Sequence, residues 1–123
     1  MMSDLFAPGI PAESIYSRRL RAHMVNGEGM EPGLRSGRDY VLLAPADHFQ
    51  GEGVYLVELT TGDPALYRVQ SKLGGRLRLS LDNPVFGDNG TQCTAAQFAE
   101  ICLGIVVANI IVKDAHFLRE VSR

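Results

Sequence analysis

The chain has 123 residues, of which 46% are hydrophobic and 21% are charged, a composition that can bury one ordinary globular core. Its 14 acidic and 12 basic residues give a formal net charge of −2, without the basic excess that supplies most of the affinity of nucleic-acid binders. The longest apolar stretch, residues 101–112, contains Gly104 and Asn109 and is too short to span a bilayer. We therefore expect a soluble cytoplasmic domain that contacts no membrane and does not bind DNA directly.

The two cysteines, Cys93 and Cys102, are too far apart for a CxxC motif and have no paired histidines nearby. This spacing predicts reduced thiols and neither a metal site nor a cofactor. A disulfide between them is an alternative that we do not favour.

In chain order, residues 1–19 predict an irregular leader, because Pro8, Gly9 and Pro11 break any regular pattern. Residues 14–20 are compatible with a short extended or helical lead-in. Three arginines lie at its end, and we expect them to form a solvated face and not a nucleic-acid patch: Arg18, Arg19 and Arg21.

From residue 20 onward, short apolar or alternating runs predict strands over residues 20–26, 40–43, 54–59, 65–71, 76–81 and 101–112. The last of these is either one long strand or two strands joined at Gly104. The clearest is 76–81, whose leucines alternate strictly with polar residues. Residues 82–91 predict a loop, 94–99 a helical turn, and the tail at 113–123 a short helix. The pattern predicts a mainly β domain over residues 20–112, with short helical turns, that curls into a barrel or sandwich.

The most distinctive segment is VNGEGMEPGL at residues 25–34, which is followed by SGRDYV at 36–41. It resembles the signature of the S24 peptidases, the family of LexA, UmuD and the phage repressors. That signature is a glycine, an acid, serine, methionine, any residue and proline, followed by Gly-Asp before the next strand. Five residues match it: Gly27, Glu28, Met30, Pro32 and Asp39.

Two features depart from this signature. Gly29 occupies the place of the serine, and Arg38 is inserted into the Gly-Asp pair, which here is Gly37-Arg38-Asp39. The resemblance nevertheless continues in order through residues 54–59, Leu66-Tyr67-Arg68-Val69, Leu81-Asp82-Asn83-Pro84-Val85-Phe86 and Gly104-Ile105-Val106. It spans about residues 20–112 and implies a LexA-like curled β domain.

In the family, the serine is the nucleophile and a lysine in the later strand is its base. Gly29 has no hydroxyl, and Tyr67 occupies the lysine's position. A phenol is mostly neutral at physiological pH and donates a proton more readily than it accepts one. The scissile Ala-Gly or Cys-Gly bond of self-cleaving members is also absent before Gly29. The resemblance therefore implies an inactive pseudo-peptidase.

Three other chemistries fit the sequence less well than an inactive pseudo-peptidase does. A relocated dyad of Ser36 and Lys72 is disfavoured, because catalysis requires accurate placement of both groups. Cys93 with His48 or His116 has no supporting spacing. A carboxylate pair or magnesium site is also conceivable, but we favour solvated loop and strand-edge acids at Glu28, Glu31 and Asp39.

Gly27, Gly29 and Gly33 do not form a strand–GxGxxG–helix motif, so they predict tight turns or positive φ angles and no nucleotide site.

Family members also dimerise, commonly through strands near the C-terminus. By resemblance, the predicted homodimer interface contains Ile105, Val107, Ile110 and Val112, although these residues could equally belong to the core. The first hypothesis is thus a non-cleaving dimerisation and regulatory module of a transcriptional regulator. It would act with a helix-turn-helix DNA-binding segment, which we do not expect within this chain, or with a partner protein.

Two further hypotheses remain open. One is a peptide-binding pseudoenzyme or a UmuD-like accessory protein in the DNA damage response, whose groove holds residues 1–13 or a partner's tail. The other is a serine hydrolase that uses the relocated dyad.

Overall fold

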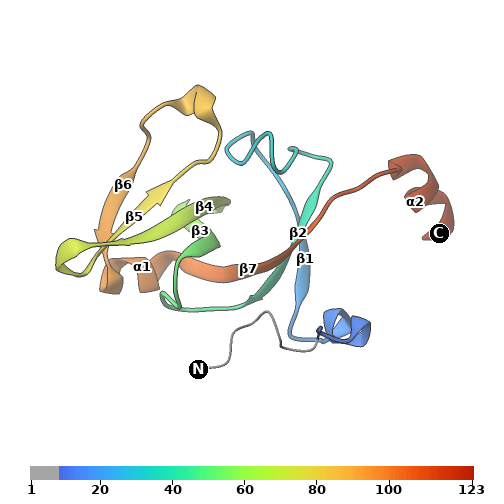
Figure 1. The fold of residues 1–123 in the computed structure, drawn as a ribbon, viewed down its shortest axis with the longest axis horizontal. Helices are drawn as coiled ribbons and strands as arrows, with labels where there is room; N and C mark the ends of the chain where they lie inside the picture. Colours follow the sequence, from blue (N-terminus) through green and yellow to red (C-terminus); the bar gives the residue numbers. More distant parts are fainter. Residues whose placement is uncertain (1–8) are drawn as a thin grey trace.

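The computed structural model describes residues 9–123 and contains a seven-stranded antiparallel sheet (Figure 1). Its strands are β1 (Arg21–Met24), β2 (Tyr40–Pro45), β3 (Gly53–Thr60), β4 (Asp63–Lys72), β5 (Arg76–Ser80), β6 (Thr91–Thr94) and β7 (Cys102–Ile110). The helices are α1 (Ala95–Ile101) and α2 (Ala115–Val121), and the short 3-10 turns are η2 (Ala12–Tyr16), η3 (Leu73–Gly75) and η4 (Pro84–Phe86). The predicted mainly β class is confirmed.

The strand order is β1-β2-β7-β3-β4-β5-β6, so the last strand of the chain lies inside the sheet. β7 pairs with β2 on one side and with β3 on the other. The sheet is not closed into a barrel, and the described strands form one sheet, so the barrel or sandwich expectation is wrong. No helix within residues 9–123 is long and apolar enough to cross a membrane.

The sheet buries apolar residues on both faces because successive side chains of a strand point to opposite sides. On one face, Tyr55 and Val69 pack in a cluster with Phe98 of α1. On the other face, Leu56 and Leu66 pack in a second cluster with residues of the segment 25–34. This segment therefore forms part of the core and covers one face of the central strands.

Helix α1 begins at a complete capping box, in which Thr94 and Gln97 each bond the backbone N–H of the other. The helix is short, and its buried residue is Phe98. The Phe98 ring lies edge-on to Tyr55, with ring centroids 5.1 Å apart. The Tyr55 hydroxyl is satisfied within the core, because it donates to Gly51 O and accepts from Gln50 N. The helical turn expected over residues 94–99 corresponds to α1.

Several expected elements differ in extent. Residues 20–26 were expected to form an amphipathic strand, but β1 ends at Met24 and none of its residues is buried. The loop expected over residues 82–91 is followed by the edge strand β6, which was not expected. The strand expected over residues 101–112 is continuous through Gly104, but it begins at Cys102 and ends at Ile110. The helix expected in the tail is α2.

Candidate functional site

Residues 25–39, here called the motif loop, are closed at their base by backbone hydrogen bonds. Val25 N donates to Asp39 O, and Gly37 N donates to Val25 O at 2.7 Å. The Ser36 hydroxyl accepts from Gly27 N, and Ser36 N donates to the Glu31 carboxylate. Gly27 and Gly37 have φ angles of +93° and +71°, which favour glycine, and they confirm the turn interpretation at Gly27.

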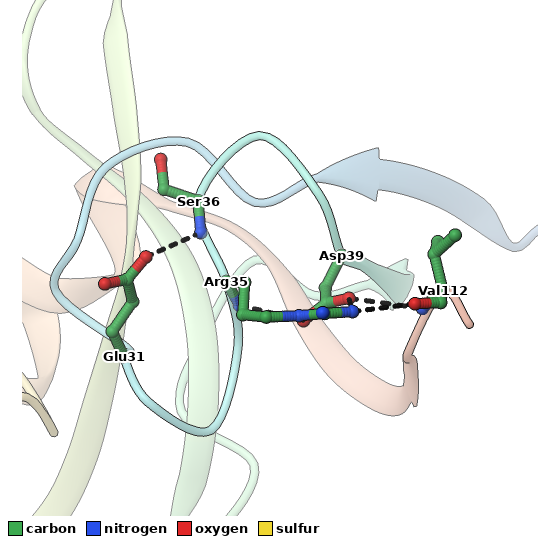
Figure 2. Close-up of polar contacts among 5 residues, drawn as sticks. All are labelled: Glu31, Arg35, Ser36, Asp39 and Val112. Carbon is green, nitrogen blue, oxygen red and sulfur yellow. Dashed lines mark hydrogen bonds and ion pairs between the residues drawn. The ribbon is translucent and has the colours of Figure 1, made fainter. Parts of the chain in front are cut away.

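Asp39 lies at the end of the motif loop and is completely buried. Figure 2 shows its carboxylate directed toward Arg35 and Val112. Its carboxylate accepts two hydrogen bonds from the Arg35 guanidinium, at 2.9 and 2.7 Å, and another from Arg35 N. It also accepts from Val112 N, while Arg35 Nη2 donates to Val112 O. The Arg35 hydrogen bonds hold the pKa of the Asp39 carboxyl well below its ordinary value, against the opposing effect of burial.

The expectation that Glu28, Glu31 and Asp39 are solvated acids is therefore wrong for Asp39. A buried carboxylate requires a partner, and Arg35 supplies one from within the same turn. Glu31 is half-buried and bonded to Ser36 N, whereas Glu28 is exposed as expected. Asp39 thus holds the motif loop together and joins it to the segment that follows β7.

Gly29 and Tyr67 line a common cavity of about 160 Å³ between the motif loop and β4. The full lining is Val25, Asn26, Gly27, Gly29, Met30, Ala65, Leu66, Tyr67 and Leu81. The structure therefore brings together the two positions that the family resemblance assigns to the nucleophile and the base. Among the lining residues there is no carboxylate, amine, imidazole, thiol or aliphatic hydroxyl.

Two residues after β5 fix the motif loop around Gly29. Asn83 donates its backbone N–H to Gly29 O at 2.8 Å and its side-chain amide to Glu28 O at 2.8 Å. Leu81 fills the space beside Gly29, because a Cβ added at Gly29 would lie 2.7 Å from Leu81 Cδ2. A serine at this position would have to displace Leu81.

Tyr67 borders the cavity, but its side chain packs against the cluster on the α1 face. Its cross-strand partner is Tyr55, and directly opposite residues of an antiparallel pair point to the same side of the sheet. Leu66, the neighbour with the opposite orientation, packs in the cluster beneath the motif loop. The lining thus offers apolar groups where a Ser-Lys enzyme needs a base.

The structure does not bring the relocated dyad together. The Ser36 hydroxyl is bonded to Gly27 N in the motif loop. Lys72 lies five residues beyond Tyr67, at the end of β4 where it pairs with Arg76. At about 3.3 Å per residue, this places Lys72 roughly 16 Å along the strand from the cavity.

Cys93 and the histidines are also separate. Cys93 lies on β6 opposite Leu77, and burial raises the pKa of its thiol, which opposes formation of a thiolate nucleophile. His48 is bonded to Asp47 in an exposed turn, and His116 belongs to α2. Both cysteines are free thiols.

Over residues 9–123, no group of three or more His, Cys, Asp or Glu side chains is placed to hold a metal ion.

The four residues expected at a dimer interface differ in exposure. Val107 and Ile110 are exposed, and the exposed fraction of Val107 is 53%. Ile105 and Val112 are half-buried, and Ile105 packs against the cluster on the α1 face. Of these four residues, Val107 and Ile110 are therefore the ones available for contact with another chain.

β7 pairs with β3 only as far as Ile105, whereas it pairs with β2 as far as Ile110. Within the described part of the chain, residues 106–110 therefore have a strand on one side only. An apolar groove of about 480 Å³ continues from this edge to α2. Its lining is Ile110, Ile111, Val112, Lys113, Asp114, Phe117, Leu118 and Val121.

Sequence reasoning missed Arg35 and gave Asn83 and Leu81 no role of their own. The sequence did contain a signal for the ion pair of Arg35, because this arginine lies four residues before Asp39 of the motif. The roles of Asn83 and Leu81 depend on contacts with a loop more than 50 residues earlier, such as the Asn83–Glu28 bond, so spacing could not reveal them.

In comparisons with known proteins, no family model matches this chain and no curated protein matches it.

Proposed function

We propose that this chain is a non-cleaving regulatory domain of the LexA and phage-repressor type, which acts by forming a homodimer. The proposal rests on the ordered motif resemblance and on one structural observation: the unpaired edge of β7, residues 106–110, continues into the apolar groove beside α2. In the regulator, this domain pairs two copies of a helix-turn-helix segment or of a partner protein.

A second copy of the chain fits this surface for two physical reasons. An open strand edge offers backbone N–H and C=O groups that the same strand of another copy can pair antiparallel around a two-fold axis. The adjoining helix α2 has no buried residue, and it exposes Phe117 and Val121. Figure 1 shows α2 standing away from the sheet, at the opposite end of the molecule from β6. Pairing two such surfaces buries both apolar faces.

Sedimentation velocity of the full chain tests the proposed dimer. We expect the wild type to sediment as a dimer and Val107→Glu to sediment as a monomer, because the new charge would be buried at the interface. Leu59→Glu is the matched control, since Leu59 is 49% exposed on β3, away from residues 106–110. A monomeric wild type, or equal dissociation of both variants, contradicts the proposal.

The Gly29 cavity supports a second candidate, a peptide-binding pseudoenzyme or UmuD-like accessory protein. The cavity is small and lined largely by apolar groups, so it suits one apolar side chain of an extended segment. The segment named from the sequence is 1–13, of which residues 1–8 lie outside the described residues. A synthetic peptide of residues 1–13, titrated into a chain lacking them, tests this candidate. Binding that is weakened in Asn26→Arg, at an exposed lining position, supports it, and absence of binding contradicts it.

A further inference from the structure

A second cleft adjoins the apolar groove and lies between the turn at residues 37–40 and α2; the cleft and the groove share Val112, Lys113 and Leu118. Its volume is about 270 Å³. Three of its lining residues are cationic, namely Arg38 from the turn and Lys113 and Arg119 from the tail, and Tyr40 of β2 also lines it. No acidic residue lines the cleft, although acids outnumber bases in the whole chain. This cationic cleft is separate from the Gly29 cavity.

The three cations are not neutralised by neighbouring carboxylates. None of them takes part in an ion pair with any residue of the described range 9–123. The acids beside them in the chain have other partners. Asp39 is buried against Arg35, and the Asp114 carboxylate accepts a hydrogen bond from Phe117 N. Glu120 forms an ion pair with Arg123, with 3.6 Å between Glu120 Oε1 and Arg123 Nη2. Three like charges around one cleft repel each other, and a bound anion would relieve that repulsion.

The backbone beside the cleft is held in place. Val112 is bonded through both its N–H and its C=O to the Asp39–Arg35 pair. Arg38 precedes Asp39, and Lys113 follows Val112, so the Asp39–Arg35 pair fixes the two segments that carry these cations next to each other. Arg38 is also the residue inserted into the motif, and the proposed dimer does not explain its presence.

We propose that the cationic cleft binds a small anion that carries two or more charges on phosphate groups, such as pyrophosphate or the phosphates of a nucleotide. Guanidinium groups bind phosphate oxygens through paired, charge-assisted hydrogen bonds, and an ammonium group adds a point charge. A bound anion would bridge the motif loop and α2. This proposal goes beyond the proposed dimer and does not depend on it.

Isothermal titration calorimetry of the full chain tests the cleft, with pyrophosphate, ATP and succinate as separate probes. We expect pyrophosphate to bind, and Arg38→Gln and Lys113→Gln each to weaken its binding about tenfold, through loss of charge-assisted bonds. Lys72→Gln removes another exposed cation, at the end of β4, and should leave the affinity unchanged. All three side chains are exposed, so we expect each variant to fold.

ATP bound more tightly than pyrophosphate would support the nucleotide as the source of the phosphates, and the reverse would support the free anion. Absence of pyrophosphate binding would overturn the proposal. Succinate binding as tight as pyrophosphate would overturn the phosphate specificity. Binding that survives in Lys113→Gln but is lost when Arg18, Arg19 and Arg21 are all replaced by glutamine would place the anion at the other basic cluster, and would also overturn the proposal.

Discussion

Asp39 joins the motif loop to the chain after β7 through the two oxygens of its carboxylate (Figure 2). Its hydrogen bonds with Arg35 lower its pKa, so the folded protein favours the ionised form more than the unfolded chain does. The resulting stabilisation is fully present above the unfolded pKa of an aspartate, about 3.9, and is lost as the pH falls below it.

We therefore predict that Asp39→Asn lowers stability at pH 7, because it removes the charge that Arg35 pairs with inside the loop. Between about pH 4 and pH 2, the stability of the variant should also fall less steeply than that of the wild type. Denaturant unfolding across this pH range measures both effects. Asp47→Asn is the control, since the Asp47 carboxyl also has a lowered pKa but is exposed beside His48. Equal behaviour of the two variants would contradict the account of Asp39.

Gly29 offers a second test by substitution of a single residue. Its φ lies outside the left-handed region, so a serine is permitted by the backbone, and the obstacle is Leu81 at 2.7 Å from the added Cβ. We predict that Gly29→Ser costs about 1 kcal/mol, because the atom in the way is the end of a flexible, half-buried side chain that must leave its preferred rotamer. In the background Leu81→Ala the cost should fall by about 1 kcal/mol, measured as a double-mutant cycle.

Gly33→Ser provides the control for Gly29→Ser, because a Cβ added at Gly33 meets its nearest atom at 3.6 Å, an ordinary contact. An additive cycle for Gly29 and Leu81 would show that Leu81 does not fill the serine position.

Sequence periodicity predicted the strands in which apolar and polar residues alternate. In β5 the strict alternation correctly predicted that Leu77 and Leu79 are buried. β6 was missed because Thr91–Thr94 has no apolar alternation and becomes a strand by pairing with β5. β1 was predicted from the weak alternation of residues 20–26; it is an edge strand paired only with β2, and none of its residues is buried.

The candidate site was predictable in part. The resemblance placed Gly29 and Tyr67 together, and they do line one cavity. It could not show that the Tyr67 side chain packs on the opposite face, or that Leu81 occupies the space beside Gly29, since both follow from tertiary packing. The partners of Asp39 were not predicted because one of them, Val112, lies 73 residues away.

Helix α1 stabilises its face of the sheet mainly through one side chain. We predict that Phe98→Ala lowers the free energy of unfolding by about 3–5 kcal/mol, because it removes the fully buried ring that packs on Tyr55 and Phe49. Phe86→Ala, at an exposed position in η4, should cost much less. Urea unfolding of the two variants measures the difference, and equal losses would contradict the assignment of Phe98 to the core.

At the scale of the whole molecule, the described chain is one open sheet with the motif loop on one face and α1 on the other. The unpaired end of β7 and the exposed face of α2 lie at the same end of the molecule, as expected for a surface that a second copy covers. The cationic cleft lies beside the same helix. Dimer formation and anion binding can be measured separately, with Val107→Glu for the dimer and Arg38→Gln for the anion, because Arg38 lines the cleft alone whereas Lys113 lines both the cleft and the groove.

The most direct test of the central proposal, that the peptidase-like cavity no longer cleaves, is intact-mass analysis after incubation. The full chain is incubated with activated RecA, and separately with a serine-reactive fluorophosphonate, and its mass is then measured. We predict a single unmodified species of 13.4 kDa in both samples, because no carboxylate, amine, imidazole, thiol or aliphatic hydroxyl lines the Gly29 cavity. Fragments cut within the first 28 residues, or a covalent adduct mapped to Ser36, would contradict it.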